Sequence, residues 1–179
     1  MDNQLWEKSI EFHGHSCGGL AIGFKAAQLA KELLNISFSE DEEIVCVTEN
    51  DACGVDAVQV VLGCSVGKGN LIFRNRGKQA FSFFNRKTGE SVRLVLKDLP
   101  EMEKDVKQKY ILHSNGVDIF EVKKPFYSLP EKARIFSSVV CQDCGEKAAE
   151  HMVRLVEGKM VCLDCFKPYV RGFEEANSW

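Results

Sequence analysis

The chain has 179 residues, a formal net charge of −3 at pH 7 and a sequence pI near 5.9. This acidic balance provides no general attraction to nucleic acid or to anionic membranes, so we expect neither as a partner. The sequence has no run of 18 apolar residues and starts with a polar segment rather than a secretory signal, which predicts a cytoplasmic protein.

The first motif in chain order is Phe12-His-Gly-His-Ser-Cys-Gly-Gly19, which places two imidazoles and a thiol within five residues. His15 and Cys17 are ligands of the kinds that bind zinc, nickel, iron or copper, and His13 is a second-rank ligand. Residues 20–34 have helical apolar periodicity, and a helix that begins near Ser16 would favour a thiolate at Cys17. The motif predicts a metal site or a reactive thiol. The alternative is a buried structural cysteine with the histidines in polar niches.

The next apolar segment, Ile44–Thr48, is a β-branched run that predicts a strand buried on both faces, with Cys46 in the core. A polar turn over residues 49–56 leads into a short apolar helix over residues 57–62. Cys53 therefore also lies near a helix N-terminus.

Geometry limits which of these thiols can meet. Cys53 is the better partner for His15 and Cys17, because helix N-termini can converge on one pocket. Cys64 lies at the other end of the predicted helix, roughly 16 Å from Cys53 at 1.5 Å per residue. It is a second-rank ligand that would join only if the helix stops early, or through a second chain.

Residues 63–70, Gly-Cys-Ser-Val-Gly-Lys-Gly-Asn, resemble a phosphate-binding loop at first sight. A P-loop has Ser or Thr after its lysine and opens a helix, whereas Gly69 follows Lys68 here. The segment therefore predicts a glycine-rich turn. Lys68 stays a candidate for contact with an anionic group of a ligand.

The remainder of the first domain mixes strands and helices without a steady βαβ rhythm. An amphipathic helix is predicted over residues 99–112, and Pro125 and Pro130 mark a linker. The predicted strands are 71–73, 80–84, 91–96 and 117–122, with a hairpin turn at 87–90. This pattern predicts an α+β fold with a mixed sheet and packed helices.

The C-terminal segment contains two Cys-x-x-Cys pairs separated by seventeen residues. This spacing is typical of a zinc site with four thiolate ligands, Cys141, Cys144, Cys162 and Cys165. Between the pairs a hairpin is predicted around Glu157-Gly-Lys159, and a short helix is predicted from Phe166 to Val170. Knuckle, hairpin and helix in this order predict a small treble-clef finger with a structural zinc. His151 is then a surface residue. The expected domains are residues 1–135 and 136–179.

Three motifs in the first domain resemble the E-subunit family of formylmethanofuran dehydrogenase: residues 12–23, 51–59 and 63–70, as they stand in this sequence. The resemblance covers most of residues 10–96, and the terminal finger is similar to one that some members carry. It implies an α+β core, a homodimer and a pocket built from the His-x-Cys and Cys-containing motifs. Carried over by position, the implied pocket residues are His15, Cys17, Cys53, Asp56, Gln59 and Cys64.

Two functions from different classes follow. The first is a metal- or thiol-dependent accessory protein whose catalytic candidates are Cys17, Cys53 and Asp56, with zinc, nickel or iron at the core site. Gln59 and Lys68 are its candidates for cofactor binding. The second is a non-catalytic delivery or assembly factor for a molybdenum or tungsten oxidoreductase. A metal-sensing regulator is a weaker alternative, because the acidic balance disfavours DNA binding.

Overall fold

The computed structural model describes residues 2–169. The chain divides between Ala133 and Arg134 into two compact units. We call residues 2–133 the core unit and residues 134–169 the finger unit. Among the described residues, no helix combines the length and the apolar character needed to cross a membrane.

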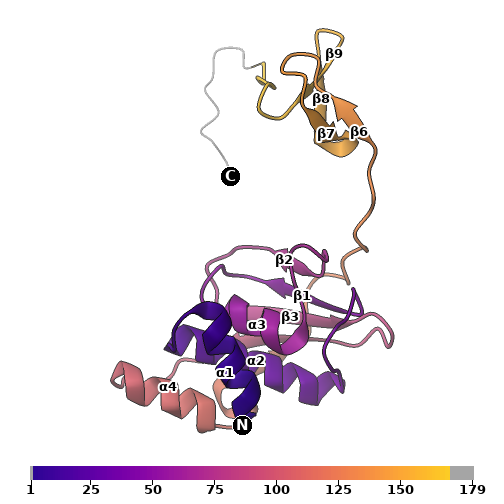
Figure 1. Cartoon of the computed structure of the whole chain (residues 1–179). Coiled ribbons are helices and arrows are strands. Elements are labelled where there is room, and N and C mark those ends of the chain that lie inside the picture. The colour runs from indigo at the N-terminus through magenta and orange to yellow at the C-terminus, as the bar shows by residue number, and fades with distance from the viewer. Residues whose placement is uncertain (1, 170–179) are drawn as a thin grey trace. The chain divides into compact units, whose positions relative to one another are not determined.

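The core unit is built on a mixed sheet with the strand order β2-β1-β3-β4-β5 (Figure 1). β1 pairs in parallel with β2, and all other pairs are antiparallel. The strands are β1 (Ile44–Thr48), β2 (Leu71–Phe73), β3 (Ala80–Asn85), β4 (Ser91–Leu96) and β5 (Phe120–Lys123). Together with the helices, this sheet confirms the predicted α+β class.

One long helix organises the helical layer. α2 (Gly18–Leu34) packs against three other helices and against β3 and β4. It is apolar on most of its circumference because neighbours cover it on several sides. The other helices are α1 (Asn3–His13), α3 (Gly54–Leu62), α4 (Lys104–His113) and the short α5 (Gly116–Ile119).

The central strand β1 is buried on both faces, as predicted. Cys46 belongs to the main core between the sheet and the helices. Val45 and Val47 point to the opposite face, where Tyr127 and Leu129 of the chain after β5 cover them. The Tyr127 hydroxyl lies 2.8 Å from Ser82 Oγ, and this hydrogen bond holds the covering segment to the sheet.

The helix α1 is absent from the sequence-based prediction. Asp2 caps it, because its Oδ1 accepts a hydrogen bond from the Leu5 N–H at 3.1 Å. Gly14 ends it in the left-handed conformation at φ +91°. An aspartate before the helix and a glycine directly after it are ordinary capping signals, so the sequence carried the information that predicts α1.

Two predicted elements between residues 99 and 122 are wrong in their limits. The helix begins at Lys104, because Pro100 and the segment after it do not adopt helical structure. The predicted strand over 117–122 starts as the helical turn α5, and only β5 pairs with β4. Short apolar segments fit either structure, and the packing of α5 against α2 decides here.

The finger unit consists of two small hairpins. β6 (Ser138–Val140) pairs with β7 (Lys147–Ala149), and β8 (Val153–Val156) pairs with β9 (Lys159–Cys162) after the 3-10 turn η1 (Glu150–Met152). The second hairpin turns at Glu157 and Gly158, both at positive φ, which suits a tight hairpin turn. Residues 166–169 of the predicted terminal helix are not helical, and Val170 lies outside the described residues.

Candidate metal centre

Three of the predicted ligands come together where two helices meet. His13 is the last residue of α1, His15 lies in the connection after it, and Cys17 caps the N-terminus of α2. One donor atom of each lies within 4.8 Å of those of the other two. The connection is short because Gly14 reverses the chain at positive φ, which an L side chain rarely adopts.

A carboxylate from a third helix fixes the His13 ring. His13 Nδ1 lies 2.7 Å from Asp56 Oδ2, and Asp56 is in the first turn of α3. Gln59 Nε2 donates to the other carboxylate oxygen at 3.2 Å. With Nδ1 bonded to Asp56, the lone pair of Nε2 is turned toward Cys17, in the manner of a metal-ligating histidine held by a carboxylate.

The distances suit a metal ion. Cys17 Sγ lies 3.9 Å from His13 Nε2, and tetrahedral zinc with its usual bond lengths separates a sulfur and a nitrogen ligand by about 3.6 Å. Cys17 Sγ also accepts a hydrogen bond from the Leu20 N–H at 3.3 Å, a donor that suits a thiolate ligand. Three ligands would leave one position of a tetrahedral ion open.

Cys53 is beside this group but not part of it. It precedes α3, and a Cβ placed on Gly19 would lie 3.5 Å from Cys53 Sγ and 3.9 Å from Cys17 Sγ. Burial, with a smaller contribution from the hydrogen bond to Cys17, raises the pKa of the Cys53 thiol. The predicted convergence of two helix N-termini is therefore observed, with Gly19 leaving the space between the two thiols.

Two further predicted residues are elsewhere. Cys64 is fully buried after the C-terminus of α3, its thiol donates to the Ile44 carbonyl at 3.7 Å, and burial raises its pKa to about 12. Lys68 donates to the Ser39 carbonyl at 2.7 Å. Both side chains tie the segment 63–70 to its neighbours, so the structure gives them no place in the His13–His15–Cys17 group.

The four cysteines of the finger unit also come together. Their Sγ atoms lie within 4.8 Å of one another, and Cys144 Sγ is 3.8 Å from Cys162 Sγ. Zinc–sulfur bonds of about 2.3 Å in a tetrahedron give a sulfur–sulfur separation of about 3.8 Å. The donor set and its dimensions therefore fit a closed zinc site.

The charges of these thiols show what a cation supplies. Backbone N–H donors from Cys144 and Cys162 lower the pKa of Cys141 to about 6, whereas hydrogen bonds with the thiols of Cys162 and Cys144 raise the pKa of Cys165 to about 12. Without a cation the cluster does not hold four thiolates near neutral pH. A divalent ion removes this conflict by stabilising all four together.

Comparison with known proteins agrees with this arrangement. The family model described as "FmdE, Molybdenum formylmethanofuran dehydrogenase operon" matches residues 12–121, which is more than half of the chain and includes the three grouped ligands and Asp56. The chain belongs to the FmdE family. A second model, the prokaryotic dksA/traR C4-type zinc finger, matches residues 134–171.

A solved FmdE relative has the same fold. This FmdE-like protein of tungsten formylmethanofuran dehydrogenase, from Syntrophus aciditrophicus, is 28% identical, with a TM-score of 0.67. The match covers 91% of this chain and 90% of that one. A similar protein from Archaeoglobus fulgidus, a "Probable S-adenosyl-L-methionine-binding protein", is 28% identical over 93% of this chain. This FmdE chain spans about half of that relative's length, 53%.

The geometry changes the ranking of the ligands within this FmdE member. Sequence reasoning placed His13 second, because nothing in the spacing distinguished it from His15. Its contact with Asp56 joins residues 43 positions apart and makes it the most constrained ligand of the group. The signal available in the sequence was the pair His13 and Cys17, which are four residues apart across a glycine.

Proposed function

We propose that this FmdE-family chain is a metal-binding accessory protein with two sites of different kinds. The core site holds a transition metal (zinc, nickel or iron) through His13, His15 and Cys17, with Asp56 orienting His13. The finger unit holds a structural zinc through its four cysteines. We assign the two sites to the two domains expected from the sequence, residues 1–135 and 136–179.

The observation that carries the core site is the 2.7 Å contact between His13 Nδ1 and Asp56 Oδ2. A histidine on the protein surface has no need of a carboxylate at this distance, whereas a ligating histidine commonly donates its second nitrogen to one. The His13 side chain is 12% exposed, so Asp56 and the neighbouring ligands largely enclose the ring. Two imidazoles and a thiolate suit zinc, nickel or iron better than calcium or magnesium.

Elemental analysis of the purified full chain tests this assignment. The wild-type protein should contain two metal ions per chain, and Cys17→Ala should contain only the finger zinc. Cys46→Ala provides a matched control, because Cys46 is also a cysteine of the core unit but belongs to the hydrophobic core, and it should keep both ions. An unchanged metal content in Cys17→Ala would overturn the core site.

A reactive thiol is the second candidate, and one geometric observation favours it. Cys17, His13 and Asp56 also form a thiol–base–carboxylate series, with Sγ 3.9 Å from Nε2. Such an order is typical of an activated nucleophile. In this case the protein purified without a core metal should react with iodoacetamide at Cys17, and His13→Gln should slow that reaction at least tenfold. Equal rates in both proteins would exclude the series as an activating device.

For partners, we propose a homodimer and an association with a molybdenum or tungsten oxidoreductase. The support is the family's description and the name of the solved relative. Sedimentation of the purified chain tests the dimer, and a monomer at micromolar concentration would contradict it. Retention of oxidoreductase subunits on the immobilised chain tests the association, and failure to retain any would overturn it.

A further inference from the structure

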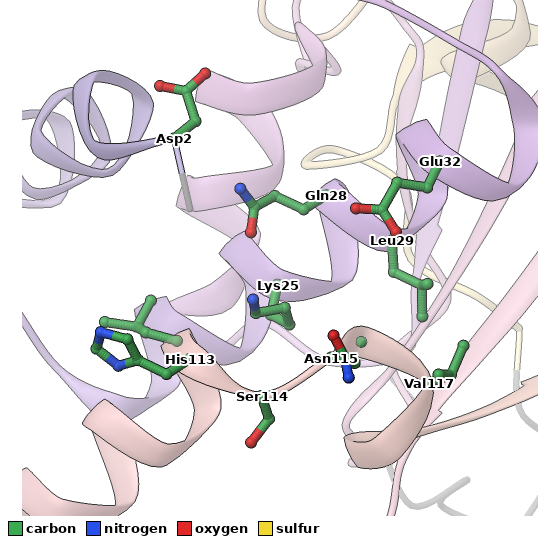
Figure 2. A pocket seen from close by; sticks show the side chains of 11 residues that line it. Asp2, Lys25, Gln28, Leu29, Glu32, His113, Ser114, Asn115 and Val117 are labelled. Carbon is green, nitrogen blue, oxygen red and sulfur yellow. The ribbon is translucent and has the colours of Figure 1, made fainter.

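A polar cavity of about 500 Å³ lies away from the proposed metal centre. It is bordered by the start of α1, the middle of α2 and the connection between α4 and α5 (Figure 2). Lys25 is eight residues after the Cys17 cap, which is about 12 Å along the helix α2. The cavity therefore shares no residue with the His13–His15–Cys17 group.

Lys25 is the unusual residue in this cavity. Its side chain lines the space together with Gln28, His113 and Asn115, as Figure 2 shows, although the residue is only 9% exposed. Among residues 2–169, no ion-pair partner reaches its amine within 4.0 Å. Burial lowers the pKa of Lys25, and the charge of Glu32 only partly opposes this effect. Burying an amine without a partner is unfavourable for folding, so an anionic partner from outside the chain would relieve the penalty.

The remaining walls indicate the size and charge of that partner. The amides of Gln28 and Asn115 can donate to an oxygen, and Leu29, Leu112 and Val117 offer apolar contact for a carbon chain. Asp2 and Glu32 also border the cavity and disfavour a multiply charged anion such as phosphate.

We propose that this cavity binds a small aliphatic monocarboxylate, whose carboxylate pairs with Lys25. One ammonium neutralises one carboxylate, and the two acidic residues exclude a second negative charge. The proposal does not depend on the metal centre, because the two sites share no residue.

Titration of the full chain with sodium butyrate tests the proposal, at constant ionic strength and followed by amide resonances in heteronuclear NMR. The signals of Gly116 and Val117 should shift and saturate with butyrate. 1-Butanol has the same carbon chain without the carboxylate, and inorganic phosphate has the charge without the chain. Neither should produce saturable shifts. Equal responses to butyrate and 1-butanol, or saturable binding of phosphate, would overturn the proposal.

Two variants test the role of the amine. Lys25→Met keeps the length of the side chain without its charge and should weaken butyrate binding at least tenfold. Lys31→Met, on the same helix but outside the cavity, should change it less than twofold. Unchanged binding in Lys25→Met would contradict the proposal. The comparison of butyrate with 1-butanol needs only the wild-type chain, so it decides the matter even where a variant does not fold.

Discussion

At the residue scale, the most informative contact is between His13 and Asp56. It converts a surface histidine into a constrained ligand and explains why α1 ends where it does, with the ring at its C-terminal end facing α3. Gln59 in turn holds Asp56. The site therefore has a second layer of side chains that bind no metal themselves but set the orientation of one that does.

The first prediction concerns this second layer. Asp56→Asn should weaken metal binding at the core site by about 10–100-fold, because the amide no longer holds the His13 ring as an anionic acceptor. A cobalt(II) titration followed by thiolate-to-cobalt absorption measures the affinity. Gln59→Ala, which removes only the support of Asp56, should have a smaller effect. An affinity in Asp56→Asn equal to that of the wild type would mean that the carboxylate does not position the ligand.

The second prediction concerns a carboxylate remote from both sites. The backbone N–H of Asp41 and the Ser39 hydroxyl donate to Glu43 and lower its pKa to about 2 from an ordinary 4.5. Because the folded-state pKa is the lower one, this stabilisation is present above about pH 4.5 and is lost as the pH falls toward 2. Glu43→Gln should therefore be less stable than the wild type at pH 6, and the difference should shrink as the pH falls through this range.

Urea unfolding at a series of pH values measures this difference. Glu90→Gln is the matched control, because Glu90 is exposed and its carboxylate has no hydrogen-bond partner among the described residues. A stability difference for Glu43→Gln that stays constant between pH 6 and pH 3 would show that the carboxylate charge is not responsible.

At the scale of elements, the close packing of α2 on α3 brings the thiols together. A Cβ on Gly23 would lie 1.9 Å from the Gly54 carbonyl oxygen, so the two helices touch through backbone atoms. Gly19, one turn earlier, leaves the space for Cys53 beside Cys17. The spacing of glycines along α2 therefore sets the distance between two helix N-termini.

The third prediction follows from this contact. Gly23→Ala should destabilise the core unit by about 1–3 kcal/mol, because the methyl group can only be accommodated by moving backbone. Gly18→Ala is on the same helix, where an added Cβ meets no atom within 4 Å, and should not have this effect. Urea unfolding measures both, and a Gly23→Ala protein as stable as the wild type would show that α2 and α3 are not in backbone contact.

At the scale of the whole molecule, the chain consists of two compact units with separate hydrophobic clusters. The cluster of the finger unit contains only Cys141, Val161 and Cys162 as buried members. So small a core does not stabilise a fold by itself, and the metal has to contribute.

The fourth prediction tests this division. Cys162→Ser should remove one zinc ion per chain and the ordered amide signals of the finger unit, while the unfolding of the core unit stays unchanged. Heteronuclear NMR and elemental analysis of the same sample measure both effects. Simultaneous loss of the core signals would show that the two units depend on each other for stability.

Much of the core fold could be predicted because the local signals and the packing agree. Ile44–Thr48 has the pattern of a buried strand and is one, since β1 is central and covered on both faces. The turn residues at 87–90 predict the β3–β4 hairpin in the same way. The segment 117–122 was mispredicted because its apolar residues suit a strand, while contact with α2 imposes a helical turn on its first half.

The sequence by itself determined which chemistry the chain carries: two imidazoles and a thiol around a glycine, and four cysteines at zinc-finger spacing. These follow from neighbours in the chain, where spacing limits geometry. Only the tertiary structure decided that Asp56 holds His13, that Cys64 is core, and that Lys25 faces a cavity. Those facts depend on how α1, α2, α3 and α4 pack, and packing joins residues that no local pattern relates.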